Sequence, residues 1–134
     1  MRFMMLMYPG AKAESGALPD AAAVAAMMKY NEELVRAGVL LAGEGLWPSA
    51  KGAQIRSAGG KRTVVDGPFT EAKEVLGGYW LIQVRSREEA IEWATRIPIG
   101  DDEMVELRQV YELSDFPADV QALAAPVEAA LQGR

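Results

Sequence analysis

The chain contains no cysteine and no histidine. Without cysteine it has no disulfide, no thiolate ligand for a metal and no thiol nucleophile. Without histidine it cannot build a Ser-His-Asp triad, a histidine-bound zinc site or an imidazole general base. Any acid–base chemistry would therefore depend on aspartate, glutamate, lysine or tyrosine side chains.

Basic charge and long apolar runs are also scarce. The sequence has 14 lysines and arginines against 19 aspartates and glutamates, a net charge of −5 and a pI of about 4.8. This balance argues against nucleic acid or an anionic membrane as a partner. No run is long enough to span a bilayer, and the short apolar run at the start does not resemble a secretion signal, so we expect a cytoplasmic protein. The 134 residues suffice for one domain with one core.

Apolar runs and helix caps predict one sheet with two helices. Asp20 is a good N-cap for a helix that ends before Gly38, and Ser86 with Glu89 forms a capping-box pattern ahead of a second helix. The expected inward stripe of the first helix is Val24, Met27, Met28, Leu34 and Val35, with the polar Asn31 among them. The expected strands are residues 3–8, 39–42, 79–84 and 104–113.

Further segments surround this core. The Gly59-Gly60 pair predicts a hairpin turn between residues 55–57 and 63–65. We expect a loop over residues 11–19, about two helical turns over residues 70–76 and a helical tail that is kinked or interrupted near Pro126. This division gives a domain of residues 1–113 and a C-terminal helical tail of residues 114–134.

The order of the core elements, βαββαβ with an inserted hairpin, predicts a ferredoxin-like α+β sandwich. Two helices cover only one face of a four-stranded sheet, but the first two strands are apolar on both faces. A second copy of the chain would cover the other face most simply, which predicts a homodimer through the open sheet face. The tail helix competes for that role or clasps the partner.

Two carboxylates are candidates for catalysis. Glu44 lies between two glycines directly after an apolar strand, so partial enclosure and a role as general acid or base are expected. Alternatively, it reaches solvent or pairs with an arginine. Asp66 is held in place by Gly67-Pro68 and could also move protons, although it could equally cap the following turn.

Other polar and aromatic side chains could bind a substrate. Arg108 could hold an anion or neutralise Glu44 or Glu106. Tyr8 could instead be a half-buried core aromatic, and Asn31 could satisfy a local backbone group. Residues 101–103 are acidic but lack the spacing of a calcium loop, and no phosphate-binding loop is present, so we expect no metal and no cofactor. The candidate binding residues are Tyr8, Asn31, Phe69, Glu71, Lys73 and Arg108.

The string DGPFTEAKEVLGGYWLIQV, residues 66–84, resembles the signature of the DGPF-type branch of YCII-related proteins. The similarity extends over residues 2–113 and includes Gly43, Glu44 and Gly45. It implies a ferredoxin-like fold that pairs into a dimeric α+β barrel. Relatives in the wider group have a His–Asp pair proposed as catalytic, which this histidine-free chain cannot reproduce. DGPF-type relatives often occur beside sigma factors, which implies a regulatory link.

Two functional interpretations follow. In the first, the chain binds a small molecule in a pocket between sheet and helices, with cofactor-free acid–base chemistry by carboxylates. In the second, it is a non-catalytic regulatory or interaction module, linked to sigma-factor-type transcription control, in which the DGPF string stabilises the fold.

Overall fold

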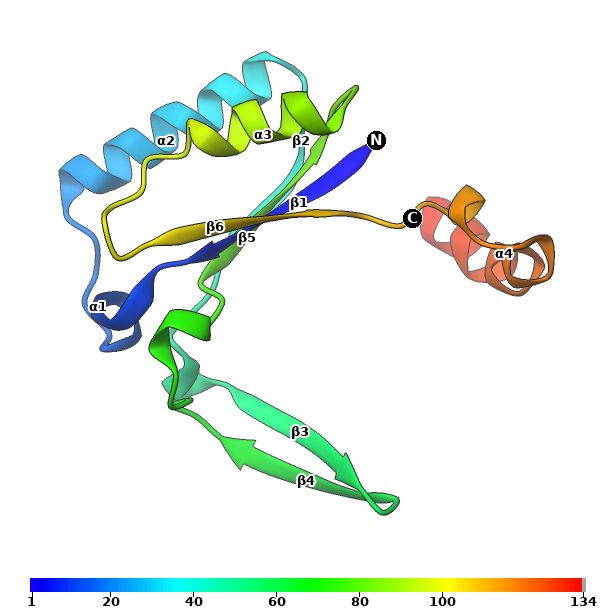
Figure 1. The fold of residues 1–134 in the computed structure, drawn as a ribbon, viewed down its shortest axis with the longest axis horizontal. Coiled ribbons are helices and arrows are strands. Elements are labelled where there is room, and N and C mark those ends of the chain that lie inside the picture. Colours follow the sequence, from blue (N-terminus) through cyan, green and yellow to red (C-terminus); the bar gives the residue numbers. More distant parts are fainter. Residues whose placement is uncertain (134) are drawn as a thin grey trace.

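The computed structural model describes residues 1–133 and contains two helices over one face of a four-stranded sheet (Figure 1). The strands are β1 (Arg2–Tyr8), β2 (Leu40–Gly45), β3 (Ala53–Ala58), β4 (Lys61–Asp66), β5 (Gly78–Gln83) and β6 (Met104–Gln109). The helices are α1 (Gly10–Glu14), α2 (Ala21–Arg36), α3 (Arg87–Thr95) and α4 (Ala118–Gln132). Short 3-10 turns occupy Ser49–Lys51 (η1), Ala72–Glu74 (η2) and Leu113–Asp115 (η3).

The four-stranded sheet has the order β2-β5-β1-β6, and every neighbouring pair is antiparallel. Counting only these four strands along the chain, the order is 2-3-1-4, which is compatible with a ferredoxin-like fold. The predicted α+β class is therefore confirmed. Strands β3 and β4 form the inserted hairpin, which turns at Gly59 and Gly60 with φ angles of 57° and 80°.

The core lies between the sheet and the helices. Alternate residues of β1 point into it, so Phe3, Met5 and Met7 are buried while their neighbours face the other side. Trp80 and Ile82 of β5 fill the same layer from the next strand. Buried side chains fill this layer, where the first functional interpretation places a pocket.

Helix α2 begins as predicted but presents a different face to the core. Asp20 caps it by accepting a hydrogen bond from the backbone N–H of Ala23 at 2.8 Å. Its buried residues are Tyr30 and Leu34, with Met27 packed beside them. The predicted stripe is therefore wrong at three positions, because the large Tyr30 ring takes the central place against Trp80 and Trp93. These three exposed residues are Val24, Met28 and Val35.

Four other segments also differ from expectation. The predicted loop after β1 contains the short helix α1, and the last strand ends at Gln109. Residues 70–76 form only η2, because the chain must stay extended to reach Gly77, whose N–H donates to the carbonyl of Met7 at 2.8 Å. Helix α4 runs through Pro126 without a break.

The hairpin and α4 stand apart from the packed layers. In Figure 1 the hairpin extends below the sheet, on the side opposite α2 and α3, and α4 lies beyond the end of β6. Within residues 1–133, nothing covers the second face of the sheet, which we call the open face. No helix in this part of the chain is long and apolar enough to cross a membrane. The open face consists of Arg2, Met4, Leu6, Tyr8, Ala42, Glu44, Tyr79, Leu81, Gln83, Met104, Glu106 and Arg108.

Candidate functional site

Half of the predicted site residues, Tyr8, Glu44, Asp66 and Phe69, lie in segments that run to one end of the sheet, which we call the hairpin end. There β1 ends at Tyr8 opposite Met104, and β2 ends at Gly45 opposite Gly78. The segment that links the hairpin to β5 returns to the same end, since the N–H of Leu46 donates to the carbonyl of Gly77 at 2.9 Å. Tyr8, Glu44 and the residues after Asp66 are thus brought to one region by three separate parts of the chain.

Glu44 lies on the open face, opposite Tyr79 in the β2–β5 pairing. Its side chain is exposed, so the expected partial enclosure is wrong for the single chain. The reason is that β2 is an edge strand and strand alternation points Glu44 away from the helices. The neighbouring Gly43 points inward instead, where an added Cβ would lie 3.4 Å from the Trp80 ring.

Asp66 ends β4 with an exposed side chain, while the residues after it are tightly held. The Gly67 N–H donates to the carbonyl of Gly52 at 3.0 Å, and the Gly67–Pro68 peptide bond is cis. A Cβ at Gly67 would lie 1.6 Å from the carbonyl oxygen of Ser49, so only glycine fits. The DGPF string therefore fixes the backbone at this point and leaves the Asp66 carboxylate free to face solvent.

A polar junction formed by Glu14, Ser49 and Phe69 holds this segment from behind. The Glu14 carboxylate accepts from the Ser49 N–H at 2.6 Å and also from the Ser49 hydroxyl. That hydroxyl accepts from the Phe69 N–H at 2.9 Å. Neither Glu14 nor Ser49 is among the residues predicted from the sequence, because nothing local links positions that lie 35 residues apart.

The remaining candidates are dispersed. Glu71 and Lys73 are exposed before and within η2. Asn31 lies on the helix side of the sheet, where its Oδ1 accepts from the Trp80 indole at 2.8 Å. Arg108 is on the open face but opposite Met4, away from the hairpin end, and its Nη1 lies 3.2 Å from Glu106. The alternative that Arg108 neutralises Glu106 thus agrees with the structure.

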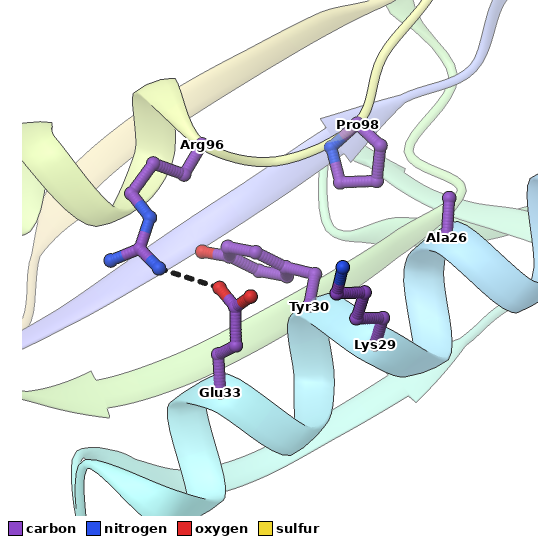
Figure 2. Close-up of a pocket in the computed structure, with 6 residues that line it drawn as sticks. All are labelled: Ala26, Lys29, Tyr30, Glu33, Arg96 and Pro98. Carbon is purple, nitrogen blue, oxygen red and sulfur yellow. Dashed lines mark hydrogen bonds and ion pairs between the residues drawn. The ribbon is translucent and has the colours of Figure 1, made fainter.

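One hollow on the surface lies between α2 and the turn after α3 (Figure 2). It has a volume of about 380 Å³, and Arg96 on its rim pairs with Glu33 at 2.5 Å. The Arg96 guanidinium also lies 4.3 Å from the centre of the Trp93 ring. Burial raises the pKa of the Tyr30 phenol, which donates to the Trp93 carbonyl at 2.7 Å. Tyr30, Glu33 and Arg96 thus have partners within the chain, and the ammonium group of Lys29 completes the polar lining of the hollow.

A second hollow, of about 560 Å³, lies along the outer side of α2 and is lined by Met28, Asn31, Glu32, Val35 and Arg36. Both hollows are therefore on the helix layer and away from Glu44 and Asp66. Among residues 1–133, no group of three or more acidic side chains is close enough to hold a metal ion.

Comparison with known proteins adds a family and one relative. The sequence profile of the YCII-related domain matches residues 1–114. A protein of Rhizobium meliloti (strain 1021), described as uncharacterized, is 39% identical over 64 residues. The matched region is 48% of this chain and 52% of that protein, so the chain spans about half the length of this relative.

Proposed function

The chain belongs to the YCII-related domain family, and on this premise we propose that it is a homodimer that binds a small molecule where the open faces of two copies meet. The proposed site is the hairpin end of the open face. Glu44 would accept a proton or a hydrogen bond from the ligand, and Asp66 would be a second carboxylate for acid–base chemistry without a cofactor. We propose a cytoplasmic location for this activity.

The observation that supports the dimer is the apolar centre of the open face. Met4 lies opposite Leu81, and Leu6 lies opposite Tyr79, so four apolar or aromatic side chains form one cluster on the central strands. An antiparallel sheet with one solvated face normally has polar residues there. The same cluster on a second copy would be self-complementary about a two-fold axis.

The chemistry of the hairpin end indicates the class of ligand. Glu44 and Tyr79 are cross-strand partners, and Tyr8 ends the neighbouring central strand. A carboxylate beside aromatic rings suits a molecule that presents hydroxyl or amino hydrogens together with an apolar body. Stacking of a second sheet would exclude water and strengthen the hydrogen bonds of Glu44 to such a ligand.

Native mass spectrometry of freshly purified protein tests both parts of this proposal. We expect twice the chain mass together with an additional retained mass. The variants Glu44→Gln and Asp66→Asn should reduce the retained mass, while Glu88→Gln, an exposed carboxylate on α3, should not. Full retention in both site variants would overturn the assigned roles.

A matched pair of variants tests the interface. Leu6→Lys places a charge in the apolar cluster and should convert the dimer to a monomer in light scattering after size-exclusion chromatography. Val35→Lys places the same charge on the exposed outer side of α2 and should leave the dimer intact. A wild-type chain that remains monomeric at high concentration would contradict the proposal.

A non-catalytic regulatory module is the second candidate, and the close packing around Gly67 supports it. If the DGPF string serves only the fold, then Gly67→Ala should lower the melting temperature, Asp66→Ala should leave it nearly unchanged, and a metabolite screen should find no ligand. A ligand that stabilises the wild type but neither carboxylate variant would exclude this candidate.

A further inference from the structure

We infer that helix α4 of one copy packs on the β3–β4 hairpin of the other copy, so that each dimer contains two such exchanged contacts. This inference rests on the proposed homodimer. It names the two segments, α4 and the β3–β4 hairpin, through which the copies make contact outside their open faces. It concerns two elements whose contacts with the rest of residues 1–133 are few: α4 mainly contacts the adjacent η3, and the β3 and β4 strands mainly contact each other.

Helix α4 is uncovered on its apolar side. Its stripe, Val120, Leu123, Val127 and Leu131, follows helical spacing, and Leu123 and Val127 are 79% and 63% exposed. Its main contact within the chain is the adjacent turn η3. A helix of 15 residues is marginal in water without tertiary packing, so α4 requires a surface to cover this stripe.

The β3–β4 hairpin also has an uncovered apolar surface, which could pack against the stripe of α4. Ile55 and Val64 are direct cross-strand partners on one face, and they are 66% and 67% exposed. The two strands contact each other extensively but have no comparable contact with another element of residues 1–133. An isolated two-stranded hairpin is marginal in water, and packing a helix on its apolar face is one way to stabilise it.

The charges of the two elements are complementary. The hairpin has three basic residues and one acidic residue; Arg62 and Asp66 share the face of Ile55 and Val64, whereas Arg56 and Lys61 lie on the opposite face. Helix α4 has Asp119 and Glu128 and no basic residue. On a helical projection these two carboxylates flank the apolar stripe on opposite sides. An acidic helix with an apolar stripe therefore fits the Ile55–Val64 pair with Arg62 beside it, at the end of the hairpin away from Asp66.

Topology indicates that the partner is a second copy. The hairpin follows the Gly45 end of the sheet, whereas α4 follows the Arg2 end, where Glu112 pairs with Arg2 at 2.7 Å. These ends are separated by the length of a strand, roughly 20 Å. The hairpin and α4 also follow opposite edge strands, β2 and β6, and a two-fold axis that crosses the sheet diagonally between two stacked open faces exchanges both the ends and the edges. It thereby brings α4 of each copy to the hairpin of the other.

Crosslinking between two tagged chains tests this arrangement, because the natural chain has no cysteine. Leu123→Cys and Val64→Cys chains, coexpressed with different tags, are treated with a short bismaleimide. We expect a crosslinked species that contains both tags, and little crosslinking when either variant is expressed alone. The control pair, Ala122→Cys with Thr63→Cys, places the thiols on the opposite faces of the same elements and should crosslink poorly.

Light scattering on the same samples separates the possible failures. A dimer by mass without the mixed crosslink overturns the exchange of α4 and leaves the homodimer standing. A monomer by mass overturns both. A double variant, Leu123→Cys with Val64→Cys in one chain, that crosslinks only within itself would show that α4 packs on its own hairpin, which also overturns the inference.

Discussion

At the scale of single residues, Gly67 is the most constrained glycine of the chain. Replacing it by alanine would place a Cβ 1.6 Å from the Ser49 carbonyl oxygen, so the loop or η1 must shift. We expect Gly67→Ala to lower the free energy of unfolding by about 3 kcal/mol, measured by urea denaturation.

Gly45→Ala is the matched control, because a Cβ at Gly45 meets nothing within 4 Å. We expect this variant to change stability by less than about 1 kcal/mol. Equal losses in the two variants would show that close approach to Ser49 is not the reason for glycine at position 67.

The hydrogen bond between Asn31 and Trp80 gives a second prediction at this scale. Asn31→Ala leaves the indole N–H of Trp80 without its partner in a half-buried place, and we expect a loss of about 1–2 kcal/mol. Glu32→Ala, at an exposed neighbouring position, should have little effect. Unfolding is monitored by tryptophan fluorescence. If the free energy of unfolding of Asn31→Ala equals that of the wild type, the bond to Trp80 does not explain Asn31, which would again be a candidate for ligand binding.

The helix caps were predictable from the sequence, because each cap is a local interaction. Asp20 bonds three residues ahead, and the Ser86 hydroxyl accepts from the Glu89 N–H at 3.1 Å. The junction of Glu14 and Ser49 was not predictable, because it requires three distant segments to be in place. The exposure of Glu44 was missed for a related reason, since flanking glycines do not indicate which face of an edge strand a side chain occupies.

At the scale of elements, strands and turns followed the local pattern more closely than helix faces did. Gly59-Gly60 predicted the hairpin because positive φ angles at both positions favour glycine. The face of α2 depended on Tyr30, whose ring packs edge-on against two tryptophans from other elements. Residues 70–76 have helical composition, but the hydrogen bond of Gly77 to β1 limits them to one short turn.

The ion pair before α4 predicts a pH dependence. The hydrogen bond from Arg2 lowers the pKa of Glu112, so the charged carboxylate favours the folded chain. This contribution is present above the usual glutamate pKa and is lost as the pH falls through the lowered value. We expect the Glu112 carboxyl signal in NMR to titrate at a lower pH in the wild type than in Arg2→Gln, in which the carboxyl group loses its hydrogen-bond donor. Identical titrations in both chains would contradict the pairing.

Packing of α4 on the hairpin predicts protection from hydrogen exchange. Leu123→Lys should remove the apolar cover of Ile55 and Val64, and we expect faster exchange across residues 53–66 in a chain that is still dimeric. Ala122→Lys, on the opposite side of the helix, is the control. Hairpin exchange that is unaffected by Leu123→Lys would mean that another surface covers the hairpin.

At the scale of the whole molecule, the order of the elements was enough to predict the α+β class and the sheet with helices on one face. The open face was also predictable, because β1 is apolar at consecutive positions from Phe3 to Met7. The positions of the hairpin and α4 were not predictable, since neither packs on the core that determines the fold. The exposure of the candidate site could not be predicted from the sequence either, because its proposed enclosure depends on the second copy.

Charge complementarity between copies gives a prediction for the assembled molecule. Arg62 lies on the same hairpin face as Ile55 and Val64, and Glu128 flanks the stripe of α4. Arg62→Glu places like charges together, and we expect it to weaken dimerisation about fivefold in analytical ultracentrifugation at low salt.

Adding Glu128→Arg to that chain restores opposite charges across the interface, so the double variant should regain most of the lost affinity. Arg87→Glu, an equal change of net charge on α3, should leave the dimer unchanged and so excludes a general effect of charge. If the double variant dimerises no better than Arg62→Glu, the two residues do not face each other. The hairpin would then contact a different part of the partner.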